Sequence, residues 1–258
     1  MSQKRKNWKI NIVFIFALWL ILLFSSLTVL SAAVTPFLRN LQTQSVVSLD
    51  WAGYAAASSL IIQQPIVVGV NGSWTVPTVS VSTFDAYSAA WVGIGGQFDA
   101  TLIQVGTEHD SLNGQESYSV WYEMLPDESV TIENVSIKPG DRIAAAISLL
   151  DSDANSWLIE IDNLSNGQSF HQTFIYNSTR LSAEWVVERP TVNNEITTLA
   201  DFGNVIFTEA SAQVGTTTGT IKSFPNYEIV MNNRQNTQLV EISTLSADGT
   251  SFSVTYSR

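Results

Sequence analysis

The chain has 258 residues, no cysteine, only two histidines and a formal net charge of −11 at pH 7. After Ala33 it holds all 23 acidic residues but only 8 of the 12 basic ones, which gives this part a charge of about −15 and argues against nucleic acid or an anionic membrane surface as a partner. The missing cysteines exclude disulfides and thiol chemistry, so the fold must depend on its hydrophobic core.

The N-terminus has the pattern of a targeting segment. Four basic residues among the first nine precede an uncharged apolar run, Ile10 to Leu30, and the small residues Ser31-Ala32-Ala33 follow it. The run is also long enough to cross a bilayer. We therefore expect residues 1–33 to be a signal peptide or a membrane anchor, with cleavage favoured. The protein is then secreted, and it stays at a membrane only if the segment is retained.

Residues 34–47 have weak periodicity and are expected to be a linker or a short pro-segment, so that 48–258 forms one domain. Beyond Ser48 the pattern is that of short β-strands separated by Asn-Gly, Pro-Gly and Asp-Gly turns. The expected strands lie near 66–76, 87–95, 101–108, 116–125, 129–135, 142–150, 157–162, 169–176, 182–188, 203–212, 227–231, 238–244 and 250–256. This spacing predicts an all-β domain, either a sandwich of two large antiparallel sheets or a barrel.

Alternation assigns side chains to faces in the strand 102–108. Leu102, Gln104, Gly106 and Glu108 share one face, opposite Ile103, Val105 and Thr107. An amide placed among apolar residues must find hydrogen-bond partners, because an unpaired buried amide costs roughly 1–3 kcal/mol. On this strand alone, a structural role, with Gln104 in the core or at an edge and satisfied by a neighbouring strand, is favoured over a functional one.

Two other strands place a carboxyl group among aromatic or apolar residues. In 117–125, Glu123 shares a face with Trp121, and in 182–188, Glu184 shares a face with Val186 and Glu188. A face that carries both Trp and Glu is typical of a half-buried cleft floor.

Several chemistries are excluded by missing motifs. The sequence has no G-x-S-x-G nucleophile turn, no H-E-x-x-H zinc helix, no paired Asp-Thr/Ser-Gly turns and no phosphate-binding glycine loop. The acidic stretch 151–156 lacks the glycine of a calcium loop and is interpreted as a hairpin turn, and His171 as a structural histidine. Carboxylate chemistry remains, with Glu108, Glu123, Glu184 and Glu188 as candidates.

In combination, the motifs resemble those of the glutamic peptidases, or eqolisins. The strings, in order along the chain, are DWAGY (50–54), WTVPTV (74–79), AAWVGIGG (89–96), LIQVG (102–106), VWYEMLPD (120–127), KPGDRI (138–143), IDNLSNGQS (161–169), AEWVVERP (183–190) and ADFGNVIFT (200–208). The resemblance implies a β-sandwich of two seven-stranded curved antiparallel sheets, similar to concanavalin A-like lectins and glucanases. It also implies an acid endopeptidase that uses a Gln–Glu dyad and neither metal nor cofactor.

By motif position, the catalytic pair falls on Gln104 and Glu184. Trp91 and Glu123 match residues beside that pair, and Trp121 and Glu108 complete the expected substrate-binding set. The sequence departs from the family pattern at Gly95 and Ser119, where the family usually has Asp. It also departs at Glu108, where the family has Asp, and at Arg189-Pro190, where the family has Asp-Phe. These changes affect the hydrogen bonds of the cleft and leave the dyad in place.

The expected function is therefore a secreted, monomeric acid endopeptidase that acts on polypeptides. Two alternatives share the fold. One is a lectin-like carbohydrate-binding module that stacks sugars on Trp121 and Trp91, and the other is a glycosidase that uses Glu123 and Glu184 as its carboxyl pair. Gln104 distinguishes the three, because neither alternative needs it.

Overall fold

The structure, a computed structural model, describes residues 43–257. The segment 1–33 and residues 34–42 lie outside the described residues. The strands are β1 (Thr43–Ser48), β2 (Trp51–Ala57), β3 (Val67–Thr75), β4 (Ala89–Gly95), β5 (Leu102–Leu112), β6 (Gln115–Met124), β7 (Val130–Thr131), β8 (Arg142–Asp151), β9 (Ser156–Asn163), β10 (Gln168–Ile175), β11 (Ser182–Glu188), β12 (Thr191–Val192), β13 (Glu195–Ile196), β14 (Asn204–Val214), β15 (Thr217–Thr220), β16 (Asn226–Met231), β17 (Val240–Ile242) and β18 (Phe252–Tyr256). One 3₁₀ turn, Ile221–Ser223, is the helical element of this part, and no helix within residues 43–257 is long and apolar enough to cross a membrane.

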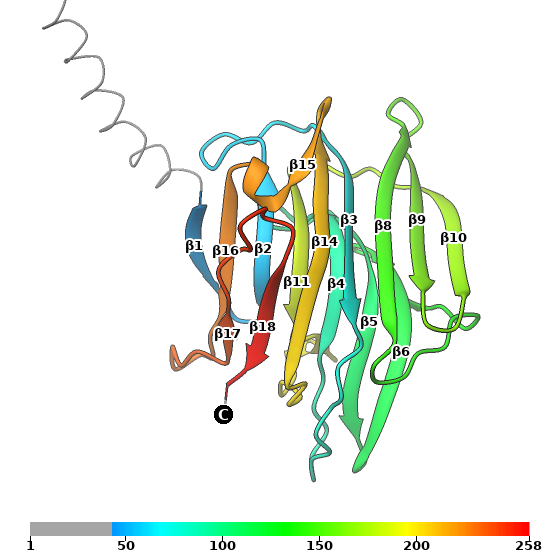
Figure 1. The fold of residues 1–258 in the computed structure, drawn as a ribbon, viewed down its shortest axis with the longest axis vertical. Helices are drawn as coiled ribbons and strands as arrows, with labels where there is room; N and C mark the ends of the chain where they lie inside the picture. Colours follow the sequence, from blue (N-terminus) through cyan, green and yellow to red (C-terminus); the bar gives the residue numbers. More distant parts are fainter. Residues whose placement is uncertain (1–42, 258) are drawn as a thin grey trace, which may run out of the picture. The chain divides into compact units, whose positions relative to one another are not determined.

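Two large sheets lie face to face as two layers (Figure 1). Sheet A has the order β1-β16-β2-β11-β4-β5-β6-β7, and sheet B has the order β10-β9-β8-β3-β14-β18-β17, with β15 paired to β14. The predicted sandwich of two large antiparallel sheets is confirmed. Strands that are neighbours in space, such as β2 and β11, are often far apart in the sequence.

The sheets differ in detail from the sequence expectation. Each has eight strands instead of seven, and β1 pairs with β16 in parallel. Residues 43–47, expected as linker, belong to β1, so sheet A begins before Ser48. The strand β2 was also absent from the expected strands, because WAGYAAA is buried on both faces and shows no alternation.

The core fills the space between the two sheets. Sheet A contributes side chains such as Val92, Val105 and Trp185, and sheet B contributes Trp74 and Phe207, all at most 2% exposed. The predicted face assignments hold: the odd-numbered residues of β5 from Ile103 to Thr107 point into this core or its edge. Their even-numbered neighbours therefore lie on the outer face of sheet A, where the candidate site forms.

Candidate active site

Four neighbouring strands of sheet A bring the candidate residues into one row. Glu184 on β11 lies opposite Gly93 on β4, Gly93 opposite Gln104 on β5, and Gln104 opposite Glu123 on β6. All four residues face away from the core, as alternation predicts. Gly93 lies between Gln104 and Glu184 in this row and has no side chain that would separate theirs.

Trp91 lies over this row. An added Cβ on Gly93 would be 2.8 Å from Trp91 Cζ3, and one on Gly106 would be 2.5 Å from Trp91 Cβ. The two glycines therefore let the indole lie flat against the sheet. Its Nε1 donates to Glu188 Oε2 at 2.7 Å, and Trp51 packs edge-on against it with ring centroids 4.9 Å apart.

Gln104 is held by Glu123. The amide is 3% exposed, and its Nε2 donates to Glu123 Oε2 at 2.5 Å. Burial raises the pKa of Glu123, while the Gln104 hydrogen bond lowers it and the Glu108 charge raises it. The Gln104 Oε1 atom is buried and has no hydrogen-bond partner. The Gln104 amide is thus held in place through its nitrogen, while its oxygen lacks a hydrogen-bond donor.

Glu184 is fully enclosed, with 0% exposure, and neither carboxyl oxygen makes a hydrogen bond of good geometry. Desolvation raises its pKa well above the ordinary value. The Asp99 charge adds to this, and the Ser182 hydroxyl and the backbone N–H groups of Gly95 and Gln97 oppose it. Glu184 therefore lies beneath the cleft floor and does not line the open cleft.

The cleft itself has a volume of about 610 Å³ and opens on the outer face of sheet A. Its lining includes four of the sequence-predicted site residues: Gln104, Glu108, Trp121 and Glu123. The other two, Trp91 and Glu184, lie directly below with no exposed surface. All six residues thus come together on neighbouring strands of sheet A, four of them lining the cleft and two of them buried below it.

Carboxyl groups around the cleft share a raised pKa. Burial raises the pKa of Glu188 to about 8, with the Asp50 charge adding to it, and burial raises that of Glu108, whose Oε2 accepts a hydrogen bond from Ser119 Oγ at 2.9 Å. Next to them, Asp110 has a pKa of about 7, raised by burial and by Glu108. The cleft therefore holds protonated carboxyl groups in acid and accumulates mutual repulsion as the pH rises.

Some cleft-wall residues were missed by the sequence reasoning. Val46 and Val47 of β1 form part of one wall, and Pro190 to Val192, at the start of the β12–β13 hairpin, form part of another. Trp51 was present in the DWAGY string, although no role was assigned to it. The β1 residues carried no signal, because an exposed edge strand has no buried face to set its pattern.

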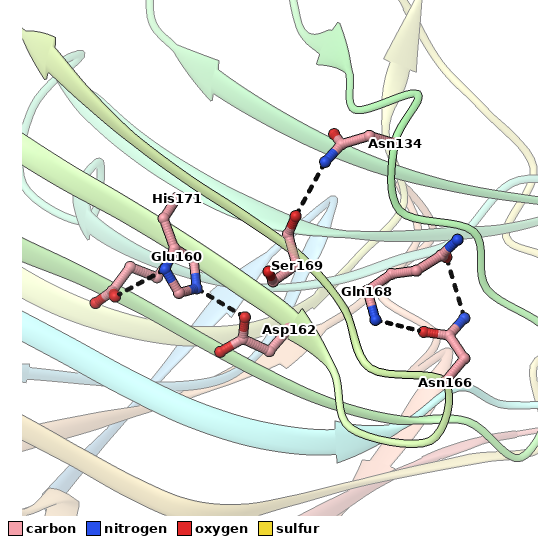
Figure 2. Close-up of polar contacts among 7 residues, drawn as sticks. All are labelled: Asn134, Glu160, Asp162, Asn166, Gln168, Ser169 and His171. Atoms are coloured by element: carbon pink, nitrogen blue, oxygen red, sulfur yellow. Dashed lines mark hydrogen bonds and ion pairs between the residues drawn. The ribbon is translucent and has the colours of Figure 1, made fainter.

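Neither histidine takes part in the cleft. His109 is buried on the core side of β5, bonded through Nε2 to Thr107 Oγ1 at 2.7 Å, and desolvation lowers its pKa to about 3. His171 lies on sheet B, where it contacts Asp162 at 2.7 Å and Glu160 at 3.7 Å (Figure 2). It connects β9 and β10 on the surface, which is a structural role.

The described residues contain no group of three or more His, Cys, Asp or Glu side chains arranged to hold a metal ion. The stretch 151–156 forms the turn between β8 and β9, as predicted, with Asp151 Oδ1 accepting the backbone N–H of Asp153 at 2.9 Å.

A β-sandwich with a buried Gln beside carboxyl groups, under a cleft that neither histidine lines, is the arrangement that the resemblance to the glutamic peptidases implies. The Peptidase A4 family model matches residues 49–256. The chain therefore belongs to the Peptidase A4 (eqolisin) family, and the resemblance drawn from the sequence is confirmed.

Individual relatives agree with this assignment. Aspergillopepsin-2 of Aspergillus niger is 30% identical over 242 residues, which cover 84% of this chain and 80% of the relative. Scytalidopepsin B of Scytalidium lignicola is 24% identical over 234 residues, 86% of this chain and 83% of the relative.

Solved structures share the fold. Aspergilloglutamic peptidase from Aspergillus niger superposes with a TM-score of 0.58 at 31% identity, covering 67% of this chain and 99% of that one. Scytalido-glutamic peptidase with a transition state analog inhibitor gives a TM-score of 0.69 at 23% identity, covering 82% of this chain and all of that one.

Proposed function

We propose that this peptidase is an exported acid endopeptidase in which Gln104 and Glu184 act together on one water molecule. The observation that carries the proposal is the row across Gly93. Gln104 Oε1 is a buried acceptor without a partner, and both oxygens of Glu184 are buried with no hydrogen bond of good geometry, although Ser182 and the Gly95 and Gln97 N–H groups lie near them. Such atoms cost free energy unless a donor reaches them, and a water molecule offers two donors.

The reaction follows from these positions. Ionised Glu184 takes a proton from the water, whose oxygen attacks the carbonyl carbon of the scissile peptide bond. A Gln104 N–H donates to the oxygen that becomes negative, a contribution of about 3–4 kcal/mol in comparable sites. Protonated Glu184 then gives its proton to the leaving nitrogen, the C–N bond breaks, and the free acid and amine form without a covalent intermediate.

The raised pKa of Glu184 sets a condition on this mechanism. In its desolvated state the carboxyl group is protonated in acid, so the first step needs contact with water or substrate. A water that donates a hydrogen bond to the carboxylate lowers its pKa, and the remaining burial makes the ionised form a stronger base. Opening of the layer formed by Trp91 and Leu102 over Gly93 would provide that contact.

Glu123 and Glu188 have supporting roles in this proposal. Glu123 accepts from Gln104 Nε2 and so fixes the plane of the amide, which leaves its second N–H for the oxyanion. Glu188 accepts from Trp91 Nε1 and so holds the indole against the sheet. Both contacts position the reacting groups and place neither carboxyl group at the scissile bond.

The lectin-like and glycosidase alternatives lose support, because the family match covers nearly the whole described domain and its relatives are peptidases. The test compares substrates directly. Purified protein beginning near Val34 should hydrolyse an acid-denatured protein at acidic pH and release new amino termini, while it leaves β-glucans intact and does not bind them. Hydrolysis of a glycoside without cleavage of any polypeptide would overturn the proposal.

A further inference from the structure

A second cavity of about 530 Å³ lies beside the cleft. It is lined by the residue that follows β11, the β12–β13 hairpin with the segment after it, the turn that connects β16 to β17, and Tyr256 of β18. Two arginines, Arg189 and Arg234, contribute to its wall, together with Asn233, Gln235 and the carboxyl group of Glu195. Two arginines in one cavity are unusual in a domain in which acidic residues far outnumber basic ones.

The two arginines are a large share of the domain's few basic residues, and neither of them forms an ion pair within residues 43–257. Residues 43–257 contain 23 acidic residues and six basic ones, and two of the six share this one cavity. Neither arginine forms an ion pair with any residue in the described part of the chain. Arg189 is half-buried and Arg234 is exposed, and two guanidinium groups without an ion pair that line one cavity indicate a site for an external anion.

Arg189 is partly committed to the fold and partly available. Its Nη2 donates to the Leu49 carbonyl at 2.5 Å and its backbone N–H to the Asp50 carbonyl at 2.8 Å, whereas its buried Nε has no partner. Burial lowers the pKa of Arg189, the nearby Asp50 charge raises it, and the Arg234 charge lowers it. Like charges held this close are relieved by a bound anion.

Arg234 is exposed at the tip of a turn that hydrogen bonds make rigid. Asn233 Oδ1 accepts the backbone N–H groups of Gln235 at 3.0 Å and Thr237 at 2.8 Å, and Asn232 Nδ2 donates to Asn236 Oδ1 at 2.8 Å. A fixed backbone presents the guanidinium group at a defined place, which reduces the entropy lost on binding.

The cavity and the cleft share a wall. Ser48 and Asp50 line the cleft, and the backbone around them bonds to both arginine-bearing segments: Asn232 N donates to the Ser48 carbonyl at 2.9 Å, and Arg189 to Leu49 and Asp50. On the other side, Glu188 and Pro190 line the cleft while Arg189 lines the cavity. A chain that leaves the cleft over this rim reaches the arginines within a few residues.

We propose that Arg189 and Arg234 form a second binding site, which takes an anionic oxygen group of the polypeptide substrate a few residues away from the scissile bond. The inference rests on the proposed peptidase function. Arginine stays charged at every pH at which the protein works, while a phosphate monoester, with a second pKa near 6, keeps one negative charge in acid. A phosphorylated serine is therefore the substrate group that fits the site best under acidic conditions.

The experiment uses a reporter peptide and a series in which one serine, three to eight residues from the cleaved bond, is replaced by phosphoserine. For at least one position, the KM at pH 4 should be about tenfold or more below that of the matched serine peptide. Arg234→Gln should remove this difference and leave the serine peptide unchanged, and added salt should reduce it. Arg142→Gln, an exposed change on β8 in the other sheet, is the matched control and should keep the difference.

Titration of inorganic phosphate into wild type and Arg234→Gln tests the site without catalysis. Binding that the substitution weakens at least tenfold supports the anion site, and binding that it leaves unchanged overturns it. Phosphate binding at Arg234 combined with equal KM values for all peptides would overturn the substrate role and identify a site for free anions. Absence of cleavage of any peptide would count against the proposed function, while the phosphate titration would still decide on the site.

Discussion

The clearest stability prediction concerns Asp110, which lies on β5 beside the cleft carboxyl groups. The residue is 5% exposed, and its Oδ1 accepts the backbone N–H of Ser88 at 3.1 Å. Burial and the Glu108 charge raise its pKa from 3.8 to about 7. Since the folded state holds this proton more tightly than the unfolded chain, the folded state is favoured below pH 4. This advantage is lost as the pH rises towards 7.

The size of the effect follows from the shift. A difference of about 3 pH units corresponds to roughly 4 kcal/mol, which is an upper bound on the stability lost between pH 4 and pH 8. Asp110→Asn has nearly the same shape, stays neutral and can still accept from Ser88. We expect this variant to match wild type within about 1 kcal/mol at pH 4 and to be more stable by roughly 2–4 kcal/mol at pH 8.

Urea unfolding at pH 4, 6 and 8, followed by circular dichroism, measures this difference. The lowered pKa of His109 has the opposite effect, because it makes the fold less stable as the pH falls from 6.5 towards 3. Both proteins contain His109, so its contribution cancels in the difference between them. Asp153→Asn, in the exposed turn after β8, is the control and should show no pH-dependent gain. The prediction is wrong if Asp110→Asn is no more stable than wild type at pH 8, or if its gain in unfolding free energy is the same at pH 4 and pH 8.

Three further predictions follow from other parts of the molecule. Amino-terminal sequencing of secreted protein should place the mature start between Val34 and residue 42, which keeps β1 and its cleft wall, and a start within β2 or at Met1 would contradict this. Proteolysis at acidic pH should survive pepstatin, serine-protease reagents and chelators, and a strong loss with a chelator would indicate a metal mechanism. Gly106→Ala should destabilise the fold by about 2 kcal/mol or more in thermal unfolding, because the added Cβ would lie 2.5 Å from the Ala90 carbonyl oxygen. Gly69→Ala is the control: its added Cβ would have contacts of 3.5 Å or longer, and it should cost less than about 1 kcal/mol.

Local sequence patterns were sufficient for much of the fold and for the faces of the site strands. Alternation with period two sorted the residues of these strands into two faces, and the structure shows that the face with Gln104, Glu123 and Glu184 is the outer one. Turn residues marked most of the hairpins. These features depend on neighbouring residues only, so a single sequence contains them.

Other features depend on contacts between distant segments. The row through Gly93 needs β11 to pair with β4, about 90 residues earlier, and no local pattern encodes that pairing. Glu184 is fully buried, and Trp91 and Leu102 reach over the neighbouring Gly93; such contacts between strands set the exposure of a residue, whereas alternation predicts only its face. The strand β1 was missed because its partner β16 lies just over 180 residues away.

The central claim, that Gln104 and Glu184 work as a unit, is tested by Gln104→Ala, Glu184→Gln and the double variant. The measurement is kcat for hydrolysis of a denatured protein at acidic pH, with circular dichroism to confirm folding. Glu188 cannot take over from Glu184, because it lies four residues, or about 13 Å, further along β11. Each single variant should lose at least about 10²–10³-fold in kcat, and the double variant little more than the worse single one. A folded Glu184→Gln protein that cleaves at a rate comparable to wild type would contradict the account.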